Sequence, residues 1–378
     1  MSARAALVAA LAAVLLAAAS VVVLVTSNGS STTQAPSLPN SASLQAPDTG
    51  FAGYNALAFV NDVSARWRVP RILPGSPTGD AATWIGSQNV GQPIDFAQVG
   101  TVEDVGSGFL GQSSARSARY SGFWSDSAVD YRPQLMGAVA PGDEVEAEMT
   151  RHPTGWVLRL SDLTAGWTHV AEPSMPVPQG AQVASWIEED PSPAVMSGAD
   201  LPYPKMDSVT FEDMRLNGRV PPLSVEDGEV LLSPNGVYLV PSPVVDGRFS
   251  VDPARGFQRQ YLADVAPYAY LLNHRPDLFS RSTYVDGPPA VRRTTASVVL
   301  DTLGTLESKL AGQAWPPDAR QAVLGQAAAD GQLVTDLIRW RDQRYKQTSP
   351  AITALVADST RSRPAADFAR YALGLPPG

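Results

Sequence analysis

Short apolar segments, separated by glycine, proline, aspartate and asparagine, fill the chain from Gly53 to about Asp252. Within this region apolar residues seldom recur at the spacing of a helix, and the apolar segments end where turn-forming residues cluster. Repeated short strands with turns between them are typical of antiparallel sheets that pack face to face. The pattern therefore predicts a mainly β fold, a two-sheet antiparallel β-sandwich, over residues 51–253.

Ten strands are expected, and turn signals separate them. Pro141-Gly142-Asp143 precedes one strand, while Pro153-Thr154-Gly155 and 163–166 each join two strands as a hairpin. Segments 231–240 and 247–251 continue the same pattern, which places the end of the sandwich near Pro253. The ten expected strands are residues 56–60, 64–69, 82–87, 96–102, 119–124, 144–149, 156–162, 167–172, 183–189 and 208–216.

After Pro253 the apolar period becomes helical, so residues 254–378 are predicted to form a C-terminal α-helical region. Helices are expected at 257–272, 290–310, 317–344 and 364–373, with Pro289, Pro316 and Pro364 near their starts. The sequence does not reveal the role of this region, and any protein partner of it stays unknown. Trp340 is a candidate partner contact; an amphipathic helix edge is the alternative interpretation.

The N-terminal segment is apolar and carries no charge from Ala5 to Val25, about the length that crosses a bilayer. We interpret residues 1–26 as a membrane anchor, or as a signal segment cleaved near 17–20. Arg4 is the only nearby charge and places the N-terminus in the cytoplasm. Residues 27–50 are predicted to be a flexible linker, so the remainder is expected outside the cytoplasm, membrane-anchored or, after cleavage, secreted.

The composition excludes several kinds of site. The 378 residues carry a net charge of −9 and no run of five basic residues, so no nucleic-acid partner is expected. The absence of cysteine removes disulfides, thiol nucleophiles and cysteine-bound zinc. His152, His169 and His274 lack the spacing of metal ligands. We therefore expect neither a metal nor another cofactor.

Three consecutive carboxylates, Glu188-Glu189-Asp190, end the predicted strand 183–189. Because side chains alternate along a strand, Ser185, Ile187 and Glu189 share one face and the other face carries Glu188. The two glutamates must then lie in different environments. We expect one of them in a cleft and the other in solvent; a wholly solvated acidic strand end is the alternative.

Five segments carry a more specific pattern, and their order and spacing resemble the glutamic peptidase family, the eqolisins. The resemblance covers residues 51 to about 217, a little under half of the chain. It implies a concanavalin-like or lectin-like β-sandwich that hydrolyses a polypeptide substrate in acid. The five segments are Ala82-Thr83-Trp84-Ile85-Gly86, Phe96-Ala97-Gln98-Val99-Gly100, Pro141-Gly142-Asp143-Glu144-Val145, residues 160–166 and residues 184–190.

The resemblance also implies roles for individual residues. Glu189 stands at the position of the catalytic glutamate and Gln98 at that of the catalytic glutamine, and Trp84, in the family's tryptophan strand, is a candidate substrate-binding residue. A glutamate can act as general base toward water while a neutral amide stabilises the developing oxyanion. This chemistry needs no metal and no nucleophilic side chain.

One strand departs from the family pattern. The family has an aromatic-rich Trp-Tyr-Glu-Trp stretch where this chain has Phe123-Trp124-Ser125-Asp126-Ser127, so that Asp126 replaces a glutamate. Trp124 and Asp126 are predicted to contact substrate. This departure leaves open a second interpretation, a catalytically inactive β-sandwich that binds glycan or peptide at the cell surface. A third is that residues 254–378 bind a partner and the sandwich only carries them.

Overall fold

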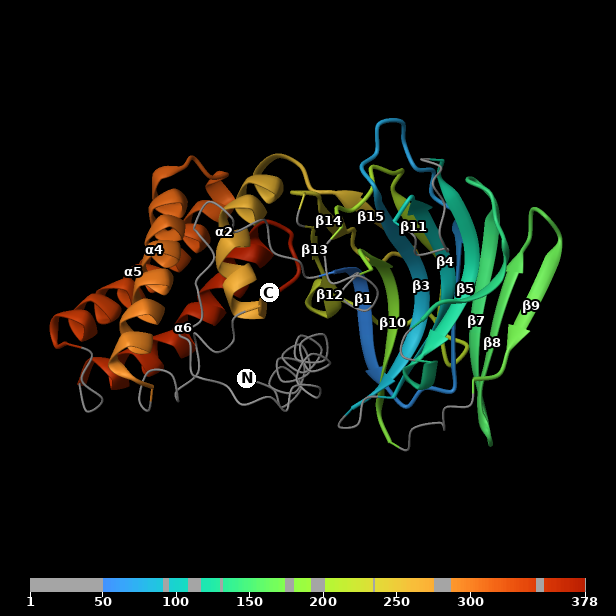
Figure 1. Ribbon diagram of the computed structural model, residues 1–378, viewed down its shortest axis with the longest axis horizontal. Helices are drawn as coiled ribbons and strands as arrows, with labels where there is room; N and C mark the ends of the chain where they lie inside the picture. The colour runs from blue at the N-terminus through green and yellow to red at the C-terminus, as the bar shows by residue number, and fades with distance from the viewer. Residues whose placement is uncertain are drawn as a thin grey trace. The chain divides into compact units, whose positions relative to one another are not determined.

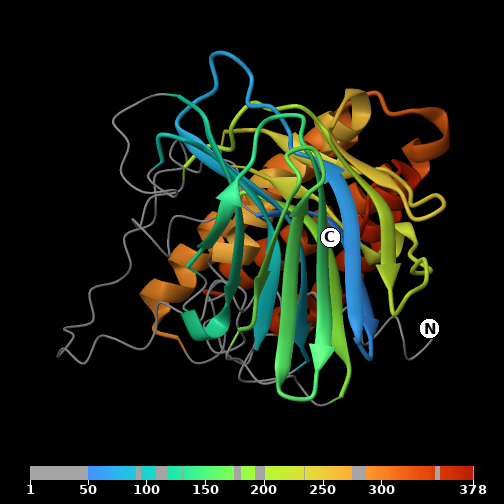
Figure 2. The ribbon, with the colours of Figure 1, turned by 90° about the vertical axis from the view of Figure 1, so that its right-hand side faces the viewer.

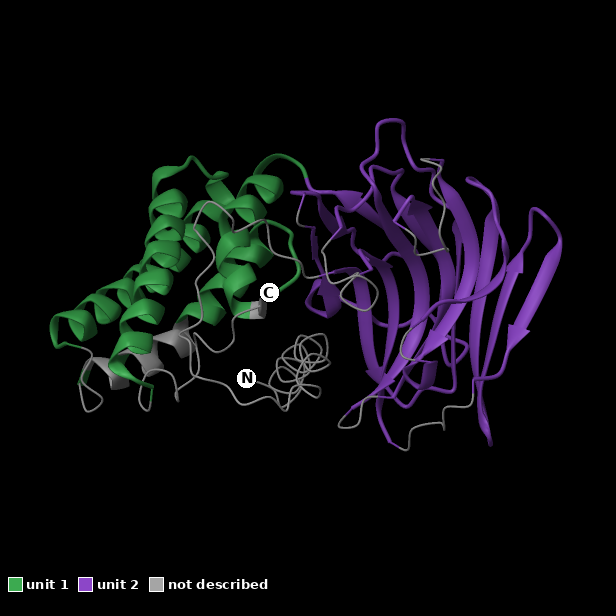
Figure 3. Cartoon of the chain, in the orientation of Figure 1, with its two compact units in different colours: residues 1–49, 255–378 green, residues 50–254 purple. Residues whose placement is uncertain are grey.

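The chain folds into two compact units, residues 50–254 and a helical unit that contains the described part of residues 255–378 (Figure 3). The division falls after Ala254, next to the predicted boundary at Pro253. The computed structural model describes residues 50–90, 95–107, 117–129, 132–173, 180–191, 201–233, 235–274, 287–344 and 350–377. Residues 1–49, with the predicted anchor and linker, lie outside this set.

The first unit is a β-sandwich of a seven-stranded and an eight-stranded sheet, and every strand pairing in it is antiparallel (Figures 1 and 2). This confirms the predicted fold class. The seven-stranded sheet has the order β12 (Gly228–Glu229), β1 (Phe51–Ala58), β10 (Gln182–Glu189), β3 (Gly79–Asn89), β4 (Phe96–Val105), β5 (Arg119–Asp126) and β6 (Gln134–Ala138). The eight-stranded sheet has the order β13 (Leu231–Leu232), β14 (Tyr238–Pro241), β15 (Phe249–Pro253), β11 (Val209–Leu216), β2 (Asp62–Arg68), β7 (Glu144–His152), β8 (Gly155–Asp162) and β9 (Trp167–Ala171).

The predicted hairpin turns are present. Residues 153–154 join β7 to β8, and Asp162 holds the turn to β9 because its Oδ1 accepts hydrogen bonds from the main-chain N–H groups of Thr164 and Ala165. Gly166 completes that turn at φ +77°, which glycine adopts without steric cost. The sequence prediction missed β6, an edge strand with few β-branched residues, and began β1 five residues too late.

Large aromatic residues fill the space between the sheets. Trp67 and Trp186 are almost completely buried there, and each indole N–H crosses to the opposite sheet. Trp67 donates to the Thr101 hydroxyl at 3.1 Å, and Trp186 donates to the carbonyl of Ser64 at 3.1 Å. These bonds satisfy the polar atoms of residues that otherwise supply apolar area.

The helical unit contains α2 (Gly256–His274), α4 (Pro289–Gly312), α5 (Pro317–Asp342) and α6 (Pro350–Ala372) (Figure 1). Its own core includes Leu303, Leu337 and Trp340. Trp340 is fully buried, so it is a core residue and the interpretation as a surface partner contact is wrong. The start predicted at Pro364 is also wrong, because α6 begins at Pro350 and contains Pro364.

None of the helices in the described ranges is long and apolar enough to cross a membrane.

Candidate active site

Strand β10 lies near the centre of the seven-stranded sheet, between β1 and β3. Trp186 packs in the sandwich core, whereas its neighbour Ile187 packs with Trp84 and Phe123 in a separate apolar cluster. The alternation predicted for β10 is therefore present. We call the side of the sheet that carries Ser185, Ile187 and Glu189 its outer face.

A row of polar side chains crosses the outer face. In register, Asn55 of β1 lies opposite Ser185 of β10, and the row continues through Gly86 to Gln98 and Ser125. The Ser185 hydroxyl donates to Asn55 Oδ1 at 2.6 Å. We call these residues the polar row.

Gln98 is buried within this row. Its Nε2 donates to the Ser125 hydroxyl at 2.8 Å, and only 7% of the residue is exposed. Within the described chain its Oε1 has no hydrogen-bond partner. A buried amide oxygen without a partner costs free energy, which is a common feature of groups that serve a ligand.

Glu189 lies farther along the same face, beside aromatic rings. It is half-buried, and its Oε2 accepts a hydrogen bond from the Trp84 indole N–H at 2.7 Å. Phe51 and Phe96 pack edge-on against Trp84, with ring centroids 6.3 and 5.4 Å away. A charged acceptor in a rigid aromatic surround keeps one orientation.

The structure does not bring Gln98 and Glu189 together. Gln98 is level with Ser185, four residues from Glu189 along β10, which corresponds to about 13 Å. Two strand spacings add a lateral distance of about 10 Å. Gln98 is also hydrogen-bonded toward β5, away from Glu189, and Trp84 lies on the strand between them.

The two residues predicted on β5 face the wrong way for a site on this surface. Trp124 packs against the sandwich core, and buried Asp126 accepts a hydrogen bond from the main-chain N–H of Val129 at 2.8 Å. Phe123 and Ser125 are the residues of this strand that reach the outer face. Trp124 and Asp126, which are predicted to contact substrate, thus lie on the inner side of β5, because the motif alone did not determine which side of this strand faces outward.

Glu188 also differs from expectation, because it points between the sheets and not into solvent. It is fully buried, and its two carboxyl oxygens accept hydrogen bonds at 2.6 Å from the hydroxyls of Thr83 and Tyr203. Glu188 and Glu189 thus lie back to back on opposite faces of one sheet.

Sequence reasoning missed a carboxyl group at the edge of the outer face. Glu229 on β12 accepts a hydrogen bond from Asn55 Nδ2 at 2.5 Å, which links it to Ser185. Burial raises the pKa of Glu229 to about 7, although the Asn55 hydrogen bond opposes the shift. It lies in a two-residue strand outside the recognised motifs, so no sequence signal marked it.

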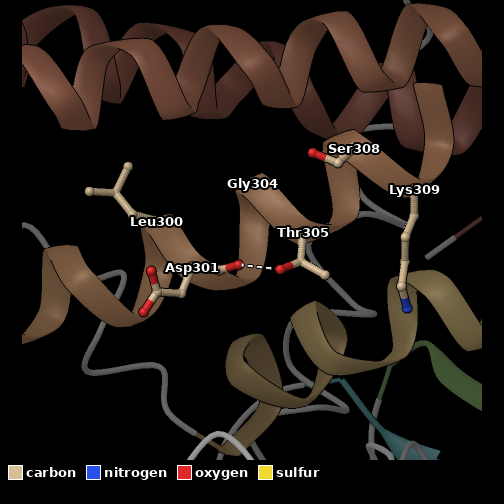
Figure 4. Close-up of a pocket in the computed structure, with 6 residues that line it drawn as sticks. All are labelled: Leu300, Asp301, Gly304, Thr305, Ser308 and Lys309. Carbon is tan, nitrogen blue, oxygen red and sulfur yellow. Dashed lines mark hydrogen bonds between the residues drawn. The ribbon is translucent and has the colours of Figure 1, made fainter. Parts of the chain in front are cut away.

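Other parts of the described chain form two open hollows. One follows α4, where Leu300, Gly304 and Ser308 line it and the Thr305 hydroxyl bonds the carbonyl of Asp301 (Figure 4). The other lies on the eight-stranded sheet beside β11 and β15. In the described ranges, no three His, Cys, Asp or Glu side chains are grouped so that they could hold a metal ion.

Comparisons with known proteins found one matching family model and several similar solved structures. The family model described as the Peptidase A4 family matches residues 49–237. Two similar solved structures are of Scytalido-glutamic peptidase, one with a peptide-based transition state analogue and one with a transition state analogue inhibitor. The first is 17% identical with a TM-score of 0.40, covering 54% of this chain and 98% of that chain. The second is 18% identical with a TM-score of 0.42, covering 55% and 100%.

A third similar structure is SCP-B, described as a member of the eqolisin family in a complex with the tripeptide Ala-Ile-His. It is 16% identical with a TM-score of 0.39, and the match covers 54% of this chain and 98% of that chain. Comparison with curated proteins finds no significant match.

Proposed function

The chain belongs to the Peptidase A4 family, the glutamic peptidases, and is a peptide-bond hydrolase of that type. From this we propose that it is an acid-acting endopeptidase in which Glu189 activates water. The observation that carries the proposal is the Trp84–Glu189 hydrogen bond of 2.7 Å within an aromatic surround. It orients a half-buried carboxylate on the outer face of the seven-stranded sheet. A carboxylate that is ionised in acid can accept a proton from the attacking water and return it to the leaving amine.

Gln98 supplies the oxyanion contact in this proposal. In the tetrahedral intermediate, the oxygen that came from water must lie about 2.8 Å from the Glu189 carboxyl, and the oxyanion about 2.8 Å from the Gln98 amide. These two oxygens are bonded to the same carbon, so only two C–O bonds separate them. In the structure the two residues are too far apart for this, about 13 Å along β10 and about 10 Å across the sheet, so the proposal requires that Gln98 releases Ser125 and that both side chains turn toward the substrate. Substrate binding therefore has to exchange the Gln98–Ser125 hydrogen bond for one to the substrate.

The proposal is tested with the purified full chain and an unstructured protein substrate between pH 2 and pH 7, with products identified by mass spectrometry. Glu189→Gln is expected to lower kcat by about 10²- to 10⁴-fold, and Gln98→Ala by about 10²- to 10³-fold. Glu172→Gln, at an exposed carboxylate, is the matched control and should cleave like the wild type. Unchanged turnover in folded Glu189→Gln would disprove the assignment of the base.

A second candidate function, peptide binding without cleavage, is favoured by the four-residue offset between Gln98 and Glu189. The residue of β10 that is level with Gln98 is Ser185, with the side-chain-free Gly86 between them. If a carboxylate must share the polar row with Gln98, the wild type binds a peptide and does not cleave it. Ser185→Glu, which adds that carboxylate, should then confer cleavage; Ser185→Gln is its uncharged control.

We also propose that the enzyme works outside the cytoplasm. The uncharged apolar run from Ala5 to Val25 supports this. Protease added to intact cells should digest the sandwich of the native protein but not that of a variant lacking residues 1–26. Equal protection of both forms would contradict export.

A further inference from the structure

Two carboxyl groups lie buried between the sheets directly behind the candidate active site. Glu103 of β4 and Glu188 of β10 are both fully buried, and each is on the inner face of the seven-stranded sheet. Glu188 lies level with Thr83 and Thr101, and Glu103 is two residues beyond Thr101. The two carboxyls are therefore diagonal neighbours across β3.

The surroundings of the pair suit neutral acids and not carboxylates. Glu188 receives hydrogen bonds from Thr83 and Tyr203. The Thr101 hydroxyl lies near the Glu103 carboxyl and opposes the rise of its pKa, but within the described chain neither Glu103 oxygen has a hydrogen-bond partner of normal geometry. No arginine or lysine is buried among the described residues of the sandwich. An ionised pair would thus place two like charges in an apolar core without a counter-ion.

The charged and titratable groups that face the pair come from several elements. Tyr203 faces both carboxyls, and Asp190 faces Tyr203. Tyr120 of β5 faces Glu103 and is itself close to Arg71 and Asp207. On the far side of β10 the pair meets the charge of Glu189.

The electrostatics follow from this burial. Burial raises the pKa of Glu103 well above its usual value, and the charge of Glu188 raises it further. Burial likewise raises the pKa of Glu188 to about 8, although hydrogen bonds from Thr83 and Tyr203 oppose the shift. Both groups therefore retain their protons in the folded protein over a pH range where an unfolded chain has lost them.

We propose that Glu103 and Glu188 form a pH-sensing pair that holds the active face of β10 in place only while both carboxyls are protonated. The effect of the pair on activity rests on the proposed function; its effect on the structure of β10 does not. Because Glu188 and Glu189 are adjacent, like-charge repulsion behind the sheet displaces the end of β10 and takes Glu189 away from Trp84. Ionisation of Glu103 and Glu188 behind the sheet then determines the highest pH at which the enzyme is active.

The direction of the pKa shifts determines whether the stability of the sandwich rises or falls with pH. A carboxyl whose pKa is raised in the folded state contributes stability that is complete below its unfolded pKa of about 4.5. That contribution is lost as the pH rises toward the folded value of about 8. The sandwich should therefore be most stable in acid and should open in the neutral to mildly alkaline range.

The test needs no substrate, so it succeeds or fails independently of the peptidase assignment. Near-ultraviolet circular dichroism of the full chain is followed from pH 3 to pH 9 for wild type, Glu103→Gln, Glu188→Gln and the double variant. The upper midpoint should rise by at least about one pH unit in each single variant, and furthest in the double variant. Glu148→Gln, in an exposed pair with Arg159, should leave it unchanged.

A second measurement covers variants that do not fold. Infrared spectra of the folded wild type at pH 6 should contain the carbonyl band of protonated carboxyls, to which Asp80 and Glu229 also contribute, and the part due to Glu103 and Glu188 should disappear over the same pH interval as the circular dichroism signal. Absence of that band at pH 6 overturns the proposal, as does an unchanged midpoint in folded Glu103→Gln.

Discussion

The hydrogen bond between Trp84 and Glu189 joins the two residues on which the proposed chemistry depends. The aromatic neighbours Phe51 and Phe96 hold the indole from both sides, and only its N–H reaches the carboxylate. In the proposed mechanism Trp84 therefore positions the base, in addition to any contact that it makes with substrate.

Replacement of Trp84 by phenylalanine removes the N–H and keeps most of the ring packing. A hydrogen bond to a charged group contributes about 1.5–3 kcal/mol, so Trp84→Phe should lower kcat/KM by about 10- to 100-fold. Steady-state kinetics in acid measure the effect. Trp156→Phe is the matched control, because Trp156 Nε1 is buried without a hydrogen-bond partner in the described chain and its loss should not affect turnover. Equal kinetics in the two variants would contradict a positioning role for Trp84.

At the scale of the strand, the site depends on how closely β3 and β4 approach under the aromatic rings. A Cβ added at Gly86 would lie 2.8 Å from the carbonyl of Ala97, 2.9 Å from the Trp84 ring and 3.1 Å from Phe96. Glycine is needed here for space, since the rings lie directly on its backbone.

The Gly86→Ala variant should therefore move the Trp84 ring and weaken its bond to Glu189. We expect a loss of about 1–3 kcal/mol in stability from overpacking, with lower kcat/KM in the protein that still folds. Gly325→Ala is the control: Gly325 lies in α5 with nothing within 4 Å of an added Cβ, so this variant should be neutral or more stable by up to about 1 kcal/mol. Thermal unfolding measures the change in stability of both variants, and steady-state kinetics measure the change in kcat/KM. Full activity in Gly86→Ala would show that the position of the Trp84 ring is not critical.

At the scale of the whole molecule, each of the two compact units has a core of its own. The sandwich core is made of residues between Ala52 and Val251, and the core that contains Trp340 is made of residues between Leu271 and Trp340. Each unit buries its own apolar residues, which is what independent folding requires.

We therefore expect residues 50–254 alone to fold and to keep the catalytic properties of the full chain. Calorimetry of the full chain should show two transitions, one of which is reproduced by the isolated sandwich. A single transition that is absent from the isolated sandwich would show that the units fold as one. A folded sandwich that has lost turnover would give the helical unit a part in the reaction.

The sequence by itself determined the class of fold, the alternation along β10 and the place where strands give way to helices. These properties are local, because side-chain period and turn chemistry act over a few neighbouring residues. The family motifs added Gln98, Trp84 and Glu189 as residues of interest, and all three lie on the same sheet.

Only the tertiary structure decided which of these residues meet. The separation of Gln98 from Glu189 depends on the register of β10 against β3 and β4, which hydrogen bonds between segments about a hundred residues apart determine. The pairing of β5 with β4 turned Trp124 inward, and the pairing of β12 with β1 brought Glu229 to Asn55. The register of a strand depends on its pairing partners, which can be distant in sequence, and on which residues are buried on each face of the sheet. It therefore cannot be predicted from the sequence of one strand.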